Sequence, residues 1–161
     1  MAIHFQKEKR LFTLQTAHTT YQMKVDDFGF LLHLYYGGKT KGDMNYLLTF
    51  YDRGFSGNPN DVEGDRTYSL NTLPQEFPVM GTGDYRSSAL IIQNGDGSES
   101  CDLRYLSHEI RKGKYELEGL PAVYAKEEEA ETLEILLQDR VSKVEVRLLY
   151  GVLEKEDIIT R

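Results

Sequence analysis

Alternation of apolar and polar residues at every second position is the pattern that most restricts how this chain can fold. Residues 144–150 run Val-Glu-Val-Arg-Leu-Leu-Tyr, and residues 20–25 run Thr-Tyr-Gln-Met-Lys-Val. Successive side chains of a β-strand point to opposite faces, so each of these segments can bury one row of side chains and leave the other in water. The sequence therefore predicts strands over most of its length.

Two hairpins are predicted where such runs flank turn residues. In the first, residues 20–25 and 30–36 lie on either side of Asp-Asp-Phe-Gly. In the second, residues 89–93 and 101–105 lie on either side of Asn-Gly-Asp-Gly, whose glycines can supply the positive φ angles of a tight turn. We expect each pair of runs to form antiparallel strands.

The segment 126–139 contains conflicting signals. Its glutamate-rich start and its leucines give it high intrinsic helix propensity. However, Leu133, Ile135 and Leu137 alternate with their neighbours, and a possible turn then leads into the alternating run 144–150. We favour a third hairpin here, with a helix as the alternative.

Length and composition are those of one domain. The chain has 161 residues, of which 40% are hydrophobic and 28% are charged. A chain of this size buries about two thirds of its unfolded surface, which is enough for a core. Strands separated by turns rich in glycine and asparagine predict an all-β fold, an antiparallel β-sandwich. The strand-like Ile158-Ile159 is followed by only two more residues, and we therefore expect the sandwich to be incomplete.

Charge and cysteine content exclude several classes of partner. The chain carries 19 Lys and Arg against 26 Asp and Glu, a net charge of −7, and has no basic run, which argues against binding nucleic acid or an anionic membrane. Cys101 is its only cysteine, so no intramolecular disulfide can form and a reducing compartment is expected. No apolar leader and no window of about 18 apolar residues is present. These patterns predict a soluble, cytoplasmic protein.

Familiar catalytic and metal-binding patterns are absent from the sequence. The four histidines show no spacing of two or four residues, so no metal is predicted. No serine lies in a Gly-x-Ser-x-Gly sequence, and the Gly-Thr-Gly and Gly-Asp-Gly segments lack the Lys-Ser/Thr ending of a phosphate loop. We expect no cofactor.

A polar stretch over residues 52–86 breaks the strand pattern and is the most specific part of the sequence. Loops on a rigid scaffold are where binding groups concentrate. The acidic and basic residues of this stretch are clustered as Asp52-Arg53, Asp65-Arg66 and Asp84-Tyr85-Arg86. Because the planar fork of arginine can bind a carboxylate at two points, we expect Arg53, Arg66 and Arg86 to brace the loop through ion pairs rather than to contact a ligand. Taken alone, Asp52 is more typical of a turn than of a binding site.

The chain contains six short motifs in this order: residues 52–59, 65–70, 73–78, 81–86, 119–122 and 129–135. Together they resemble the N-terminal region of bacterial α-galactosidases of glycoside hydrolase family 36. The resemblance implies a β-supersandwich of the galactose-mutarotase type, followed in the family by a (β/α)8 barrel that holds the two catalytic carboxylates and hydrolyses with retention. That barrel is not within residues 1–161. The chain is thus expected to be a partial N-terminal domain that is inactive alone.

The resemblance also implies a role for Asp52. The family has an aspartate in the segment matching 52–55 that accepts hydrogen bonds from hydroxyls of the terminal galactose. The domain would then supply one wall of the sugar pocket, with α-galactosides as ligands of the full-length enzyme. Family members assemble into tetramers, which implies subunit contacts. The alternative is a free-standing carbohydrate-binding or oligomerisation sandwich without catalysis.

Overall fold

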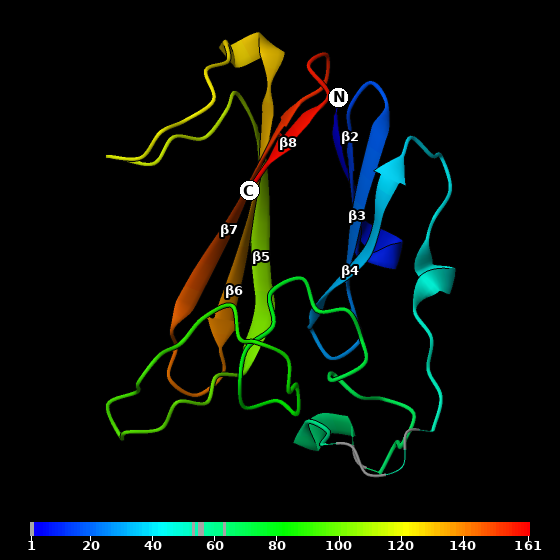
Figure 1. Ribbon diagram of the computed structural model, residues 1–161, viewed down its shortest axis with the longest axis vertical. Helices are drawn as coiled ribbons and strands as arrows, with labels where there is room; N and C mark the ends of the chain where they lie inside the picture. Colours follow the sequence, from blue (N-terminus) through cyan, green and yellow to red (C-terminus); the bar gives the residue numbers. More distant parts are fainter. Residues whose placement is uncertain (1, 53, 55–56, 63) are drawn as a thin grey trace.

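The computed structural model describes residues 2–52, 54, 57–62 and 64–161, which form two four-stranded antiparallel sheets (Figure 1). In each sheet the strands follow one another in chain order. The first sheet contains β1 (Ile3–Gln6), β2 (Leu11–Gln15), β3 (Thr19–Val25) and β4 (Leu31–Gly38). The second contains β5 (Leu103–Lys112), β6 (Glu131–Asp139), β7 (Glu145–Leu153) and β8 (Ile158–Thr160).

The prediction of an all-β antiparallel fold is confirmed. Among the described residues, helical structure is limited to four short 3-10 turns, and none has the length and apolarity needed to cross a membrane. These turns are η1 (Lys7–Lys9), η2 (Asn45–Leu47), η3 (Asn60–Val62) and η4 (Glu127–Glu129).

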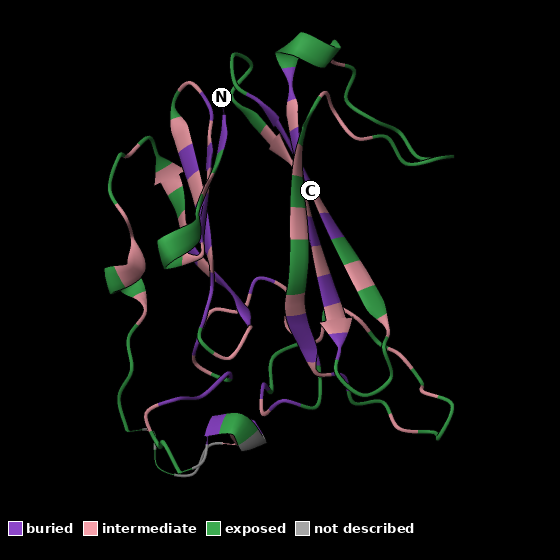
Figure 2. Ribbon diagram, turned by 180° about the vertical axis from the view of Figure 1, so that it is seen from behind, coloured by how far each residue is buried: buried purple, intermediate pink, exposed green. Residues whose placement is uncertain are grey.

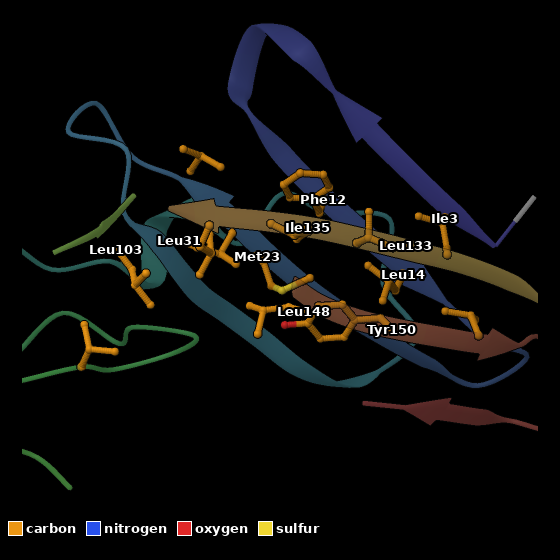
Figure 3. Packing of buried hydrophobic residues seen from close by; sticks show 14 of the residues in the cluster. Ile3, Phe12, Leu14, Met23, Leu31, Leu103, Leu133, Ile135, Leu148 and Tyr150 are labelled. Carbon is orange, nitrogen blue, oxygen red and sulfur yellow. The ribbon is translucent and has the colours of Figure 1, made fainter. Parts of the chain in front are cut away.

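The main hydrophobic core lies between the two sheets. The first sheet contributes Phe12 and Met23, and the second contributes Leu133, Ile135 and Tyr150, all of them fully buried (Figure 3). Figure 2 shows the buried and exposed positions alternating along the strands. Removing these side chains from water is the main force that holds the two sheets together, at roughly 25 cal/mol per Å² of apolar surface.

The ambiguous segment 126–139 forms a strand. β6 pairs with β5 on one side and with β7 on the other, and Leu133, Ile135 and Leu137 point into the core. Only the short turn η4 is helical. Pairing on both edges and burial of one face outweigh the helix propensity of the glutamates. The hairpins β3–β4 and β6–β7 confirm two of the three that the sequence predicts.

The predicted hairpin around residues 94–97 is wrong. The turn itself forms, with the Gly97 amide donating to the Asn94 carbonyl at 2.9 Å. Residues 89–93 form no strand, and β5 pairs instead with β6 along its whole length. Leu90 and Ile92 still pack against the core. The alternation of this run therefore reflects burial of one face without a strand partner.

The chain between β4 and β5 is long and irregular; in Figure 1 it descends beside the first sheet in cyan and continues below both sheets in green. A second hydrophobic cluster fixes this segment to the first sheet. Its buried members are Phe30, Leu32, Val62, Tyr68, Leu70 and Leu73. The segment is thus a packed part of the domain, and it carries the clustered aspartates and arginines.

Candidate functional site

Asp52 lies on the irregular segment with its carboxylate facing water. The Gly54 amide donates to Asp52 Oδ1 at 2.8 Å, and the same oxygen lies 3.1 Å from Arg66 Nη2. Gly54 has φ of +70°, which suits glycine. Both contacts use Oδ1, and 57% of the Asp52 side chain is exposed. The carboxylate is thus oriented on one side and accessible on the other.

Asp84 and Arg86 form a compact ion pair deeper in the segment. Arg86 Nε donates to Asp84 Oδ1 at 2.8 Å, and Arg86 Nη2 donates to the carbonyls of Leu70 and Leu73 at 2.7 Å each. Burial raises the pKa of the Asp84 carboxyl, but hydrogen bonds from Arg86 and Gln75 lower it by more than burial raises it. The pKa of Asp84 therefore lies below the ordinary value. The structure therefore brings these two predicted residues together and joins them to a neighbouring turn.

The other predicted residues fall in different settings. Arg53 lies outside the described residues, as does the neighbouring Phe55. Arg66 contacts Asp52 rather than its neighbour Asp65, whose carboxylate accepts from the amide and hydroxyl of Thr67 at 2.8 and 2.6 Å.

Sequence reasoning missed a network of alternating charges at the base of the segment. Asp61, in η3, lies 3.2 Å from Arg104 Nη1 and 2.8 Å from Arg140 Nη1. Asp102 pairs with both arginines as well, at 2.5 and 2.7 Å. These residues are far apart in the sequence, and no local sequence pattern predicts that they are in contact.

A buried carboxylate beside this network was also missed. Asp26 Oδ2 accepts a hydrogen bond from the Tyr68 hydroxyl at 2.5 Å, and Asp26 Oδ1 accepts from the amide of Phe30 at 2.8 Å. Burial raises the pKa of Asp26 despite these donors. The Asp26–Tyr68 pair fixes the irregular segment to the turn between β3 and β4.

Glu76 is the third group that the sequence did not indicate. Its side chain is 2% exposed and accepts hydrogen bonds from the hydroxyls of Tyr21 and Tyr150, with His33 Nδ1 at 3.3 Å and Arg161 Nη1 at 3.1 Å. Burial raises its pKa, but these donors lower it more, so that its pKa is below the ordinary value. Tyr21 and Tyr150 come from different sheets, so this carboxylate links the two.

In chemical terms, the site presents carboxylate acceptors that are oriented by arginine and amide donors. In the described ranges, no group of three or more His, Cys, Asp or Glu side chains is placed to hold a metal ion. Cys101 is buried, and burial together with Asp139 raises its pKa to about 12, so the thiol is a poor nucleophile. Ionised carboxylates of this kind act only as hydrogen-bond acceptors.

Comparison with known proteins identifies the family. Residues 29–161 match the Glycosyl hydrolase family 36 N-terminal domain. The chain belongs to this family. Among curated proteins it is 63% identical, over its whole length, to the bifunctional alpha-galactosidase/sucrose kinase AgaSK of Mediterraneibacter gnavus, and 43% identical to the alpha-galactosidase AgaA of Geobacillus stearothermophilus.

Solved structures of the family have the same fold. The galactosidase domain of AgaSK superposes with a TM-score of 0.96 over 98% of this chain at 63% identity. A doubly substituted variant of AgaA of G. stearothermophilus, in complex with stachyose, gives a TM-score of 0.84 over 90% of this chain at 43% identity. The chain covers 17% of AgaSK and 22% of AgaA among the curated sequences, and 22% and 20% of the two solved chains. It therefore spans about one fifth of the proteins it resembles.

Proposed function

We propose that this domain is the N-terminal part of an α-galactosidase that removes terminal α-D-galactosyl residues with retention of configuration. Membership of the family 36 N-terminal domain carries this proposal, and relatives that share the fold are named alpha-galactosidases. Two substituted variants of AgaA were solved in complex with stachyose and with raffinose, which supports α-galactosides as the substrate class. The catalytic carboxylates would belong to a part of the enzyme outside these residues.

Within such an enzyme, we assign to the domain one wall of the sugar pocket, with Asp52 as the galactose ligand. An ionised carboxylate only accepts hydrogen bonds and can take protons from two adjacent hydroxyls. Its exposure and its orientation by Gly54 and Arg66 support this role. Arg66 and the Asp84–Arg86 pair would hold the loop without touching the sugar, as would Arg53.

The test of this role is the Asp52→Ala variant of the full-length enzyme. Hydrogen bonds to charged groups contribute about 1.5 to 3 kcal/mol each, so kcat/KM for an α-galactoside is expected to fall roughly ten- to a few hundredfold, with the fold intact. Asp96→Ala is the matched control, because Asp96 is another loop carboxylate that accepts from the amide two residues further on, at 2.9 Å. Unchanged kinetics of Asp52→Ala would exclude the sugar-binding role.

The domain would also make subunit contacts in a homo-oligomer, for which four subunits are expected. Large apolar side chains are exposed on the same irregular segment, namely Tyr46, Leu47, Phe50, Tyr51 and Tyr85. Such a surface favours contact with a second copy of the protein. Phe50→Asp should lower the mass of the full-length enzyme measured by light scattering, whereas Ile91→Asp, at an exposed position much further along the same segment, should not. An unchanged mass would place the contacts elsewhere.

A further inference from the structure

In the charge network at the base of the irregular segment, Arg104 of the second sheet is held by several contacts. Arg104 is the second residue of β5, and its side chain is only 9% exposed. Its guanidinium lies 3.8 Å from the centre of the Phe30 ring and donates to the carbonyl of Phe28. Arg104 Nε and Nη2 bind the two oxygens of Asp102 at 2.5 and 3.1 Å. These contacts hold the Arg104 guanidinium in place independently of Asp61.

Asp61 is the point at which the loop meets this network. It lies between Arg104, in β5, and Arg140, which directly follows the neighbouring strand β6. The adjacent Val62 is buried in the second hydrophobic cluster, which also contains Leu32 of β4. One carboxylate and one apolar side chain thus fix η3 to both sheets of the domain.

Hydrogen bonds join the residues that flank Asp61 to Asp65, the residue before Arg66. The Val62 amide donates to Pro59 O at 3.0 Å, the Asp65 amide donates to Val62 O at 3.0 Å, and Asn58 Nδ2 donates to Asp65 O at 2.9 Å. These bonds draw the described residues 58–62, 64 and 65 together into one compact turn, the 58–65 turn. Arg66 follows that turn directly and pairs with Asp52 at 3.1 Å.

The Asp52–Arg66 contact needs such an anchor. Both side chains are more than half exposed, and ion pairs of this kind contribute little on their own because water and salt screen them and two long side chains must be ordered. The geometry of the Asp52–Arg66 ion pair therefore depends on where the 58–65 turn places Arg66. Asp61 and Val62 hold that turn against the two sheets.

We propose that Asp61 is a positioning residue, which acts through the 58–65 turn and Arg66 to aim the Asp52 carboxylate at the substrate. This inference rests on the proposed function, because it requires Asp52 to bind the sugar. In this proposal the Arg104–Asp61–Arg140 network fixes the position of the Asp52 carboxylate on its exposed loop. Binding groups must be held to a fraction of an ångström to be effective, and a supporting layer of contacts supplies that precision.

The test is a double-mutant cycle in the full-length enzyme with Asp52→Ala and Asp61→Asn. Asp61→Asn is expected to raise KM for an α-galactoside about three- to tenfold with kcat changed less than about twofold, because a misplaced ground-state contact affects binding more than turnover. In the Asp52→Ala background, the same substitution should change kcat/KM by less than about twofold, because residues that act through one another are not additive. Asp61→Glu, which keeps the charge, should restore part of the loss.

Glu134→Gln is the matched control. Glu134 also lies between two arginines, Arg111 at 3.1 Å and Arg147 at 3.8 Å, and its exposure is similar, but it lies in β6 away from the irregular segment. This variant should leave KM unchanged. The comparison separates loss of a paired carboxylate in general from loss of this anchor.

The outcomes separate the two proposals. If Asp52→Ala has wild-type kinetics, the proposed sugar-binding role of Asp52 fails and the inference falls with it. If Asp52→Ala is impaired but Asp61→Asn is not, or if Asp61→Asn lowers kcat/KM equally in both backgrounds, only the positioning role is overturned. A melting temperature lowered by Asp61→Asn with an unchanged KM would likewise show a purely structural residue.

Discussion

Glu76 accepts a hydrogen bond from the Tyr150 hydroxyl at 2.8 Å, which joins the irregular segment to the central part of the second sheet. Tyr21 of the first sheet donates to the same carboxylate. The Glu76 side chain is only 2% exposed, but hydrogen-bond donors surround it. A buried charge is tolerated when it is paired with donors in this way. A single acceptor thus fixes three parts of the fold.

Glu76→Gln should destabilise the domain by about 2 kcal/mol. The amide keeps one acceptor oxygen but offers an amide donor where a second acceptor stood, and an unsatisfied buried group costs about 1 to 3 kcal/mol. This loss of stability is smaller than that expected from breaking a fully buried ion pair, because Arg161 is 43% exposed and can be hydrated. Thermal or urea unfolding measures it, with Tyr35→Phe as control, since the exposed Tyr35 hydroxyl only donates to Gly38 O. Equal stability of both variants would contradict this account.

Local patterns predicted the strands, and long-range contacts explain what they missed. The alternation of Leu133, Ile135 and Leu137 can be recognised within a few residues of sequence, and the structure places all three in β6 with their side chains buried. Glu76 and Tyr150 are 74 residues apart, and Asp61 and Arg140 are 79 apart, so their meeting depends on how the whole chain folds. The failed hairpin at residues 89–93 has the same origin, because periodicity reports burial of a face and not which strand, if any, lies beside it.

The candidate site was predictable only in part. The clustered aspartates and arginines of 52–86 marked the segment, and the family resemblance singled out Asp52 within it. The anchoring groups on the sheets, Arg104 and Asp26, occur in ordinary strand and turn sequence and carry no local signal. Charged residues near the ends of strands are common, and only the three-dimensional arrangement selects these two.

The stability of the domain should fall at acid pH partly because of Asp139. Burial raises the pKa of this carboxyl, but the amides of Asp102 and Ser142 donate to it at 2.5 Å each and lower its pKa to about 2, from an ordinary value of 3.8. Between these two values the unfolded chain binds more protons than the folded one, so the contribution is complete above pH 3.8 and is lost as the pH falls towards 2. Asp139→Asn should therefore be less stable than wild type near neutral pH and should lose less stability over this range. Urea midpoints measured from pH 2 to pH 6 test it, and parallel curves would contradict the assignment.

Gly83→Ala should destabilise the irregular segment by about 1 to 3 kcal/mol, because it adds a clash to a strained backbone. Gly83 has φ of +84°, and a Cβ atom there would lie 2.3 Å from the carbonyl oxygen of Gly57. Gly64→Ala is the matched control, since Gly64 has φ of +76° but open space around its Cβ position. The control should show only the backbone cost, about 1 kcal/mol. If both variants unfold at the same urea concentration, residues 57 and 83 do not pack as described.

Arg86→Lys should weaken the same segment even though it preserves the charge. Arg86 uses its planar fork to bind Asp84 through Nε while Nη2 reaches the carbonyls of Leu70 and Leu73. A lysine ammonium is a single point donor and cannot reproduce this set, so about 1 to 2 kcal/mol of stability should be lost. Arg111→Lys is the control, because Arg111 makes one exposed contact, with Glu134, and should change stability by less than about 0.5 kcal/mol. Comparable losses in both variants, measured by urea unfolding, would show that the charge of Arg86 and not its geometry holds the turn.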